Sequence, residues 1–212
     1  MPKMPICESA GMGAEVDLEI SEQRSLIRKQ IRDQLKVHFQ TGDKKEIRDF
    51  SINRRSLSLI EKWRAQGLWC GFQARDNEPN LSELFDSSEG VKWAFPVVDS
   101  RAAQMNFYEP KDRRALSVGY NNIPEPDIHV SRLVPKEEIN GFLVPCLAVD
   151  RFGHRLGTGK GFYDKYLEGN QKLKIGICYD CQVVSEEIPA CDWDVAMDWI
   201  VTESQSIECR KD

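Results

Sequence analysis

Residues 143–167 read LVPCLAVDRFGHRLGTGKGFYDKYL and are the most informative part of the chain. The continuous apolar run over 142–149 is typical of a β-strand that is buried on both faces. A polar loop with three alternating glycines follows this run, and a short helix is expected over Phe162–Leu167. A buried strand, a glycine-rich loop and a helix in this order indicate one unit of an α/β sheet.

The rest of the chain repeats this alternation of helices with short buried strands. Ile27, Ile31 and Leu35 form an apolar stripe that predicts a helix over 19–39. We predict a single α/β domain over 19–212, a mostly parallel sheet sandwiched between helices, preceded by a flexible tail over 1–18. The other expected elements are helices over 44–66 and 80–85, strands over 68–72, 91–98, 104–108, 174–179 and 199–202, and a loop over 121–127.

Composition excludes several classes of protein. No apolar run of the 212 residues approaches the roughly 18 that a membrane helix needs. The net charge of −5 argues against binding to nucleic acid, which requires a clustered basic surface. The start of the chain lacks the features of a secretory signal, so the seven cysteines are expected to be reduced thiols of a cytoplasmic protein. The CxxC over 178–181 has no partner motif, and we interpret it as structural.

The loop over 153–164 has the composition of an anion site. Glycines at 157, 159 and 161 let the backbone approach a ligand closely, while Arg155 and Lys160 supply positive charge for phosphate oxygens. Asp164 directly after the loop is a candidate ligand for Mg²⁺, which favours one or two carboxylates plus phosphate oxygens. The loop matches neither the Walker A nor the GxGxxG pattern. A flexible loop at a strand end is the alternative interpretation.

Residues 143–167 resemble the signature of the 5-formyltetrahydrofolate cyclo-ligase family, also called methenyltetrahydrofolate synthetases. Further segments follow in the order found in that family, over about residues 21–203. They are Arg24 and Arg28, residues 77–78, Pro96, Met105 and Phe107, residues 125–126, and residues 194–203. The resemblance implies an enzyme, a ligase that forms a C–N bond. The implied reaction converts 5-formyltetrahydrofolate and ATP to 5,10-methenyltetrahydrofolate, ADP and phosphate, with Mg²⁺.

The resemblance also implies roles for individual residues. Asp164 and Asp194 match metal positions, with Asp198 a weaker candidate, and Lys160, Arg155 and Tyr163 are the expected catalytic residues. The expected folate-binding residues are Glu78, Met105, Phe107 and Tyr163. The expected ATP-binding residues are Arg24, Arg28, Arg155, Gly157, Thr158, Gly159, Lys160, Gly161, Phe162 and Tyr163.

Several departures from the family pattern bear on substrate affinity. Thr158 stands where members usually carry Tyr or Arg, Lys165 replaces the commoner Arg, and Pro79 follows Glu78. Two alternatives therefore stay open: a non-catalytic relative that binds folate and nucleotide, and an ATP-dependent enzyme for another formyl or amide substrate. The expected partners are small molecules only, with no nucleic acid and no membrane, and the protein is expected to be a monomer.

Overall fold

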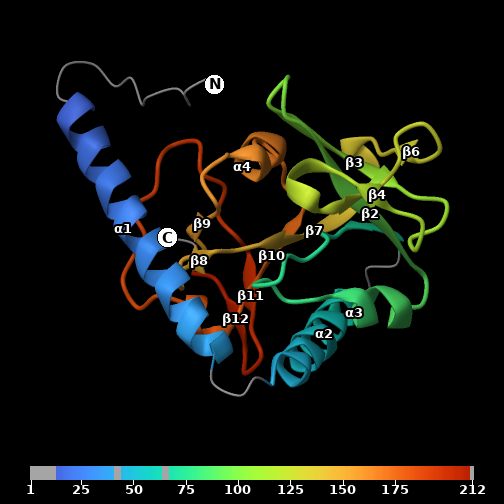
Figure 1. Ribbon diagram of the computed structural model, residues 1–212, viewed down its shortest axis with the longest axis horizontal. Coiled ribbons are helices and arrows are strands. Elements are labelled where there is room, and N and C mark those ends of the chain that lie inside the picture. The colour runs from blue at the N-terminus through green and yellow to red at the C-terminus, as the bar shows by residue number, and fades with distance from the viewer. Residues whose placement is uncertain (1–12, 41–43, 64–66, 211–212) are drawn as a thin grey trace.

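The protein is described by a computed structural model that covers residues 13–40, 44–63 and 67–210. The strands of its main sheet are β1 (Gly67–Cys70), β2 (Val91–Asp99), β3 (Gln104–Glu109), β6 (Arg132–Leu133), β7 (Ile139–Pro145), β10 (Leu173–Ile177), β11 (Trp199–Val201) and β12 (Ser206–Glu208). Their order across the sheet is β12-β11-β10-β7-β1-β2-β3-β6 (Figure 1). The five strands from β11 to β2 are parallel to one another, whereas β12, β3 and β6 are antiparallel to their neighbours.

Four α-helices and two small hairpins complete the described fold. The hairpins pair β4 (Ser117–Val118) with β5 (Pro124–Glu125) and β8 (Ala148–Val149) with β9 (Arg155–Leu156). The helices are α1 (Gly13–Gln40), α2 (Lys45–Lys62), α3 (Ser82–Ser87) and α4 (Phe162–Leu167), and single 3-10 turns occupy Tyr120–Asn122, Lys136–Glu138 and Asp180–Gln182. None of the described helices is long and apolar enough to cross a membrane.

Side chains alternate across the central strands and build a core on each face of the sheet. Trp69 of β1 packs with Ile31 of α1 and Ile52 of α2 in one buried cluster. Its neighbour Cys70 points the other way and packs with Tyr166 of α4 in a second cluster. Figure 1 shows α2 and α3 on one side of the sheet and α4 on the other. The predicted α/β domain, with its sheet sandwiched between helices, is therefore confirmed.

The sheet reverses its direction of growth between β1 and β7. The chain passes from β1 to β2 on one side, whereas β7, β10 and β11 are added in turn on the other side. In open α/β sheets, the carboxyl ends of the two strands at such a reversal diverge and leave a crevice for ligands. The topology therefore places a binding site just beyond Cys70 and Pro145.

Two sequence-based boundaries require correction. Helix α1 begins at Gly13, six residues before the predicted start, and Leu18 in this extra part is 61% exposed, so no apolar stripe marks it. Residues 1–12 of the predicted tail lie outside the described residues. Helix α2 ends at Lys62, and residues 64–66 of its predicted end also lie outside them.

The apolar run over 142–149 is not one strand. Strand β7 ends at Pro145, which has no N–H to continue the ladder. The backbone N–H of Leu147 instead donates to the carbonyl of Leu156 at 2.8 Å, and the chain turns into the β8–β9 hairpin. This turn places the glycine-rich loop beside the ends of β1 and β7.

Candidate active site

A cavity of about 940 Å³ opens at the carboxyl ends of β1 and β7. Phe72 and Gln73, which follow β1, line it together with Cys146 and Leu147, which follow β7. Residues of α1 form another part of the wall, and the loop that precedes α4 forms a third. The cavity therefore occupies the crevice that the strand order predicts.

Glycines shape the loop over 157–161 along this wall. Gly159 and Gly161 adopt φ angles of +101° and +67°, which residues with a Cβ atom rarely adopt. Gly161 directly precedes the first turn of α4. The carbonyl of Gly157 accepts a hydrogen bond from Nε of Arg28 at 3.1 Å. Lys160 is exposed at the tip and forms no ion pair with any residue that the structure describes. Its ammonium group is available to a ligand.

Arg155 is the most deeply buried cation of the site, with 5% of its surface exposed. Its Nη2 donates to Asp164 Oδ1 at 2.9 Å, and its guanidinium lies 5.7 Å from the ring centre of Tyr163. Burial opposes the charge of Arg155, but the Asp164 carboxylate, together with Cys146 and Tyr163, outweighs burial and raises the pKa of Arg155. The Nε–H of Arg155 is buried and has no partner within the described chain. Arg155 thus carries a spare donor.

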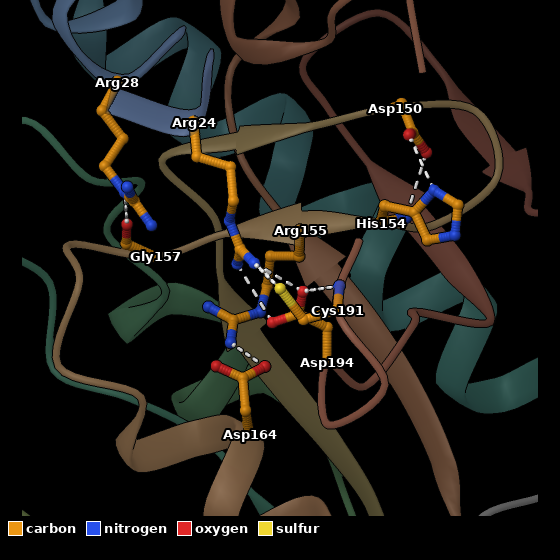
Figure 2. Close-up of polar contacts among 9 residues, drawn as sticks. All are labelled: Arg24, Arg28, Asp150, His154, Arg155, Gly157, Asp164, Cys191 and Asp194. Atoms are coloured by element: carbon orange, nitrogen blue, oxygen red, sulfur yellow. Dashed lines mark hydrogen bonds and ion pairs between the residues drawn. The ribbon is translucent and has the colours of Figure 1, made fainter. Parts of the chain in front are cut away.

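A second arginine–carboxylate pair joins α1 to the turn over 191–194 (Figure 2). Nη1 and Nη2 of Arg24 donate to the two oxygens of Asp194 at 2.8 and 3.0 Å. The backbone N–H of Cys191 also donates to Asp194, at 2.8 Å. Arg28 lies nearby, and its pKa is lowered by burial and by the positive charges of Arg24 and Arg32. This wall of the cavity is therefore rich in cations that repel one another until an anion binds.

Another part of the cavity lining holds two desolvated groups, Glu78 and Tyr163. Burial raises the pKa of Glu78, whose Oε2 accepts the backbone N–H of Arg75 at 3.0 Å. Burial likewise raises the pKa of the Tyr163 hydroxyl, and the charge of Glu78 adds to that effect. The Tyr163 hydroxyl is buried without a partner in the described chain, and Met105 lines the cavity with 6% of its surface exposed. This end fits a flat ligand that carries N–H donors and polar acceptors.

Asp164 and Asp194 both line the cavity, and each is held by an arginine. Among the described residues, no three His, Cys, Asp or Glu side chains gather in a way that could hold a metal ion. Two carboxylates beside a cationic wall nevertheless fit Mg²⁺, which keeps several waters and binds through one or two carboxylates plus phosphate oxygens. The residues fit a cation that arrives with phosphates better than they fit a permanent metal centre.

Nearly all residues expected from the sequence meet in this one cavity. They are Arg24, Arg28, Glu78, Met105, Arg155, Gly157, Thr158, Gly159, Lys160, Gly161, Phe162, Tyr163, Asp164 and Asp194.

Phe107 is the exception and requires correction. It shares the inward face of β3 with Met105, but it is fully buried and does not line the cavity. Its ring packs edge to face against Tyr163 and Tyr166, with centroids 6.3 and 4.9 Å away. Phe107 therefore supports Tyr163 from behind.

Asp198, the weaker metal candidate, also lies outside the cavity lining. Its carboxylate accepts the backbone N–H of Lys174 at 2.8 Å and pairs with the Lys174 ammonium group at 3.4 Å.

The cavity includes further residues to which the sequence assigned no role. Arg32 lines it one turn beyond Arg28, and the four-residue spacing of these arginines was the available signal. Glu125 ends the β4–β5 hairpin, and its Oε1 accepts the backbone N–H of Val98 at 3.4 Å. In the same hairpin Tyr120 contacts Phe162 edge to face. No local pattern marks these contacts, because they depend on how the hairpin folds over the sheet.

Comparison with known proteins places the chain in a family. Residues 20–203 match the profile of the 5-formyltetrahydrofolate cyclo-ligase family. The chain is 31% identical to the 5-formyltetrahydrofolate cyclo-ligase of Escherichia coli K12 over 134 residues, which are 61% of this chain and 72% of that protein. It is 32% identical to the Mycolicibacterium smegmatis protein of the same name over 148 residues, 65% of this chain and 74% of that protein.

Solved structures agree with this placement. The NMR structure of Aquifex aeolicus 5,10-methenyltetrahydrofolate synthetase superposes with a TM-score of 0.72 at 28% identity, covering 89% of this chain and 94% of that one. The synthetase from Mycoplasma pneumoniae shares the fold, with a TM-score of 0.65 at 23% identity over 85% of this chain and 98% of the other. The chain belongs to the 5-formyltetrahydrofolate cyclo-ligase family.

Proposed function

We propose that the protein is an ATP- and Mg²⁺-dependent 5-formyltetrahydrofolate cyclo-ligase, formed by one catalytic domain that includes the whole of α1. The observation that carries this proposal is the double character of the cavity. Its lining brings together four cations, Arg24, Arg28, Arg155 and Lys160. Glu78 and the buried Tyr163 hydroxyl line the same cavity, and the Tyr163 ring lies next to Arg155. A triphosphate and a flat heterocycle thus find complementary surfaces within one cavity. Family membership supports the same reaction.

The proposed reaction needs positioning and charge neutralisation rather than a nucleophilic side chain. The formyl oxygen attacks the γ-phosphorus of ATP, and ADP leaves. N10 then attacks the activated formyl carbon, closes the ring and loses its proton, while phosphate departs with the former formyl oxygen. A developing phosphoryl charge is stabilised by pre-positioned donors. Lys160 and the spare Nε–H of Arg155 supply such donors.

We assign the remaining residues by their place on the wall. Arg24, Arg28 and the backbone of 157–161 bind the phosphates. Glu78 accepts hydrogen bonds from the amino and ring N–H groups of the pterin, and Met105 and Tyr163 contact its ring or the formyl group. Asp164 and Asp194 would hold the Mg²⁺, which when bound offsets the negative charge of the phosphates. A monomer in the cytoplasm stays a prediction from the sequence.

The test is formation of the methenyl product, followed by its near-ultraviolet absorbance, with 5-formyltetrahydrofolate, ATP and Mg²⁺. We expect ATP-dependent turnover that falls about 100-fold or more in Lys160→Ala and Asp164→Asn. Matched controls are Lys172→Ala and Asp99→Asn, because both side chains are exposed and lie outside the cavity lining. These controls are expected to turn over like the wild type.

Two other outcomes would refute the proposal in different ways. ATP binding without turnover on any formamide would favour a non-catalytic relative. ADP release with another formyl or amide compound, but not with 5-formyltetrahydrofolate, would favour a different substrate. Either result would leave the fold and the family unchanged.

A further inference from the structure

Arg24 and Asp194 form an ion pair in the cationic part of the cavity lining. Both side chains are largely buried, with 13% and 10% of their surfaces exposed, and the contact is bidentate. It also spans 170 residues of sequence, because it joins α1 to the turn that precedes β11. The residue expected to bind phosphate and the residue expected to bind the metal are thus each other's partner (Figure 2).

This partnership leaves the arginine incompletely satisfied. The Nε–H of Arg24 is buried and has no acceptor in the described chain. Arg155 repeats the arrangement, since Asp164 takes one edge of its guanidinium and its Nε–H also lacks an acceptor. A buried donor without a partner is costly, and native proteins rarely keep one without a functional reason. A phosphate group, with three acceptor oxygens, can satisfy donors that the carboxylate leaves free.

We propose that, without ligands, Arg24 occupies the position that the divalent cation takes beside Asp194, and Asp194 occupies the position that the phosphates take beside Arg24. Nucleotide and cation then bind by an exchange in which this ion pair breaks and each residue contacts its ligand instead. The inference rests on the proposed function. When both ligands bind, Arg24 turns to the phosphates and Asp194 turns to the cation. When only one binds, the pair must break and one buried charge is left without a partner, which is strongly unfavourable. The structure thereby favours the metal–nucleotide complex over either component alone.

The exchange makes a prediction of unusual sign. Asp194→Asn keeps the side-chain shape and an oxygen for the Cys191 N–H, but it releases Arg24 from its ion pair. ATP titrated in EDTA without folate should therefore bind this variant more tightly than the wild type, by roughly 5- to 150-fold. Conversely, Arg24→Gln frees Asp194. Mn²⁺ titrated without nucleotide, and followed by the electron paramagnetic resonance of the free ion, should bind that variant more tightly by a similar factor.

Two further variants separate the exchange from simple loss of charge. In Arg24→Gln/Asp194→Asn the gain in metal-free ATP affinity should disappear, because the guanidinium that the single variant releases is no longer present. The double-mutant cycle thereby isolates the coupling between the two residues. Asp192 lies two residues before Asp194, but its side chain is exposed and lies outside the cavity lining. Asp192→Asn therefore removes the same charge nearby without affecting the pair, and this variant should bind ATP like the wild type. Thermal unfolding of each variant checks that α1 stays docked.

Several results would overturn the proposal. They are an unchanged or weaker metal-free ATP affinity of Asp194→Asn, a gain that persists in the double variant, or an equal gain in Asp192→Asn. In each of these cases wild-type binding of ATP in the presence of Mg²⁺ would leave the proposed function standing. Wild-type protein that fails to bind ATP even with Mg²⁺ would overturn the proposed function together with the exchange.

Discussion

Asp150 is predicted to hold the turn that leads into the glycine-rich loop. It follows β8, is 1% exposed, and accepts four hydrogen bonds. Oδ1 accepts the backbone N–H groups of Phe152 and His154 at 2.8 and 3.0 Å. Oδ2 accepts the backbone N–H of Ile188 at 2.7 Å. Oδ2 also lies 3.0 Å from His154 Nδ1, as Figure 2 shows. One carboxylate thus fixes both the turn over 150–154 and the segment that precedes the Cys191 turn.

The cost of Asp150→Asn follows from these contacts. The amide keeps one acceptor oxygen, which retains the two hydrogen bonds at Oδ1, and its NH₂ group can donate to His154 Nδ1 in the other imidazole tautomer. The NH₂ group cannot accept the N–H of Ile188, however. Losing this hydrogen bond to the carboxylate and leaving a buried N–H unsatisfied reduce the free energy of unfolding by about 2–3 kcal/mol. This is a large share of the roughly 5–15 kcal/mol that stabilises an ordinary domain.

Urea unfolding measures this loss as a lower midpoint at unchanged slope. Asp99→Asn is the matched control. One oxygen of exposed Asp99 accepts both N–H groups of its turn, from Arg101 and Ala102, and an asparagine oxygen can do the same. The control should therefore change stability by no more than about 0.5 kcal/mol. A loss below about 1 kcal/mol for Asp150→Asn, or an equal loss in the control, would show that the Asp150 carboxylate does not hold this turn.

Three further predictions concern single sites. Phe107→Ala should cost about 3–5 kcal/mol in urea unfolding, because a fully buried ring behind Tyr163 is removed; a loss under 1 kcal/mol would contradict its place in the core. Gly153→Ala should cost at least about 2 kcal/mol by the same assay, since φ is +91° and the new Cβ would lie 2.3 Å from the Met197 carbonyl; wild-type stability would argue against this geometry. Burial raises the pKa of Glu78 above its ordinary 4.5, so the folded state holds its proton more tightly and stability falls as pH rises through the folded-state pKa. Glu78→Gln should therefore melt at a higher temperature than the wild type at pH 7 and lose this advantage below pH 4.5, whereas equal melting at both pH values would contradict the assignment.

Where burial followed the local pattern, the sequence predicted the fold well. The helix expected over Phe162–Leu167 has the predicted bounds, because glycine precedes it and its apolar residues pack inward. The additional first turns of α1 and the edge strands β6 and β12 escaped prediction. Leu18 and Leu133 are exposed, so neither segment has an apolar pattern, and the two edge strands are defined by pairing with a distant neighbour.

The site residues also differ in whether neighbouring sequence or only the tertiary fold determines their contacts. Residues 155–164 could be predicted as an anion loop because their chemistry lies within ten consecutive positions. The pairing of Arg24 with Asp194 could not, because each residue alone indicates a ligand contact and only the fold reveals that they contact each other. The resemblance predicts that Phe107 binds folate, but its ring does not line the cavity. Alternation along β3 gives the face that a side chain occupies, but the rings of Tyr163 and Tyr166 decide whether that side chain reaches the cavity. Residue types thus predicted the cations and carboxylates that line the cavity at the carboxyl ends of β1 and β7. Tertiary packing decides which of these groups contact one another and which donors, such as Nε of Arg24 and Arg155, have no partner in the described chain.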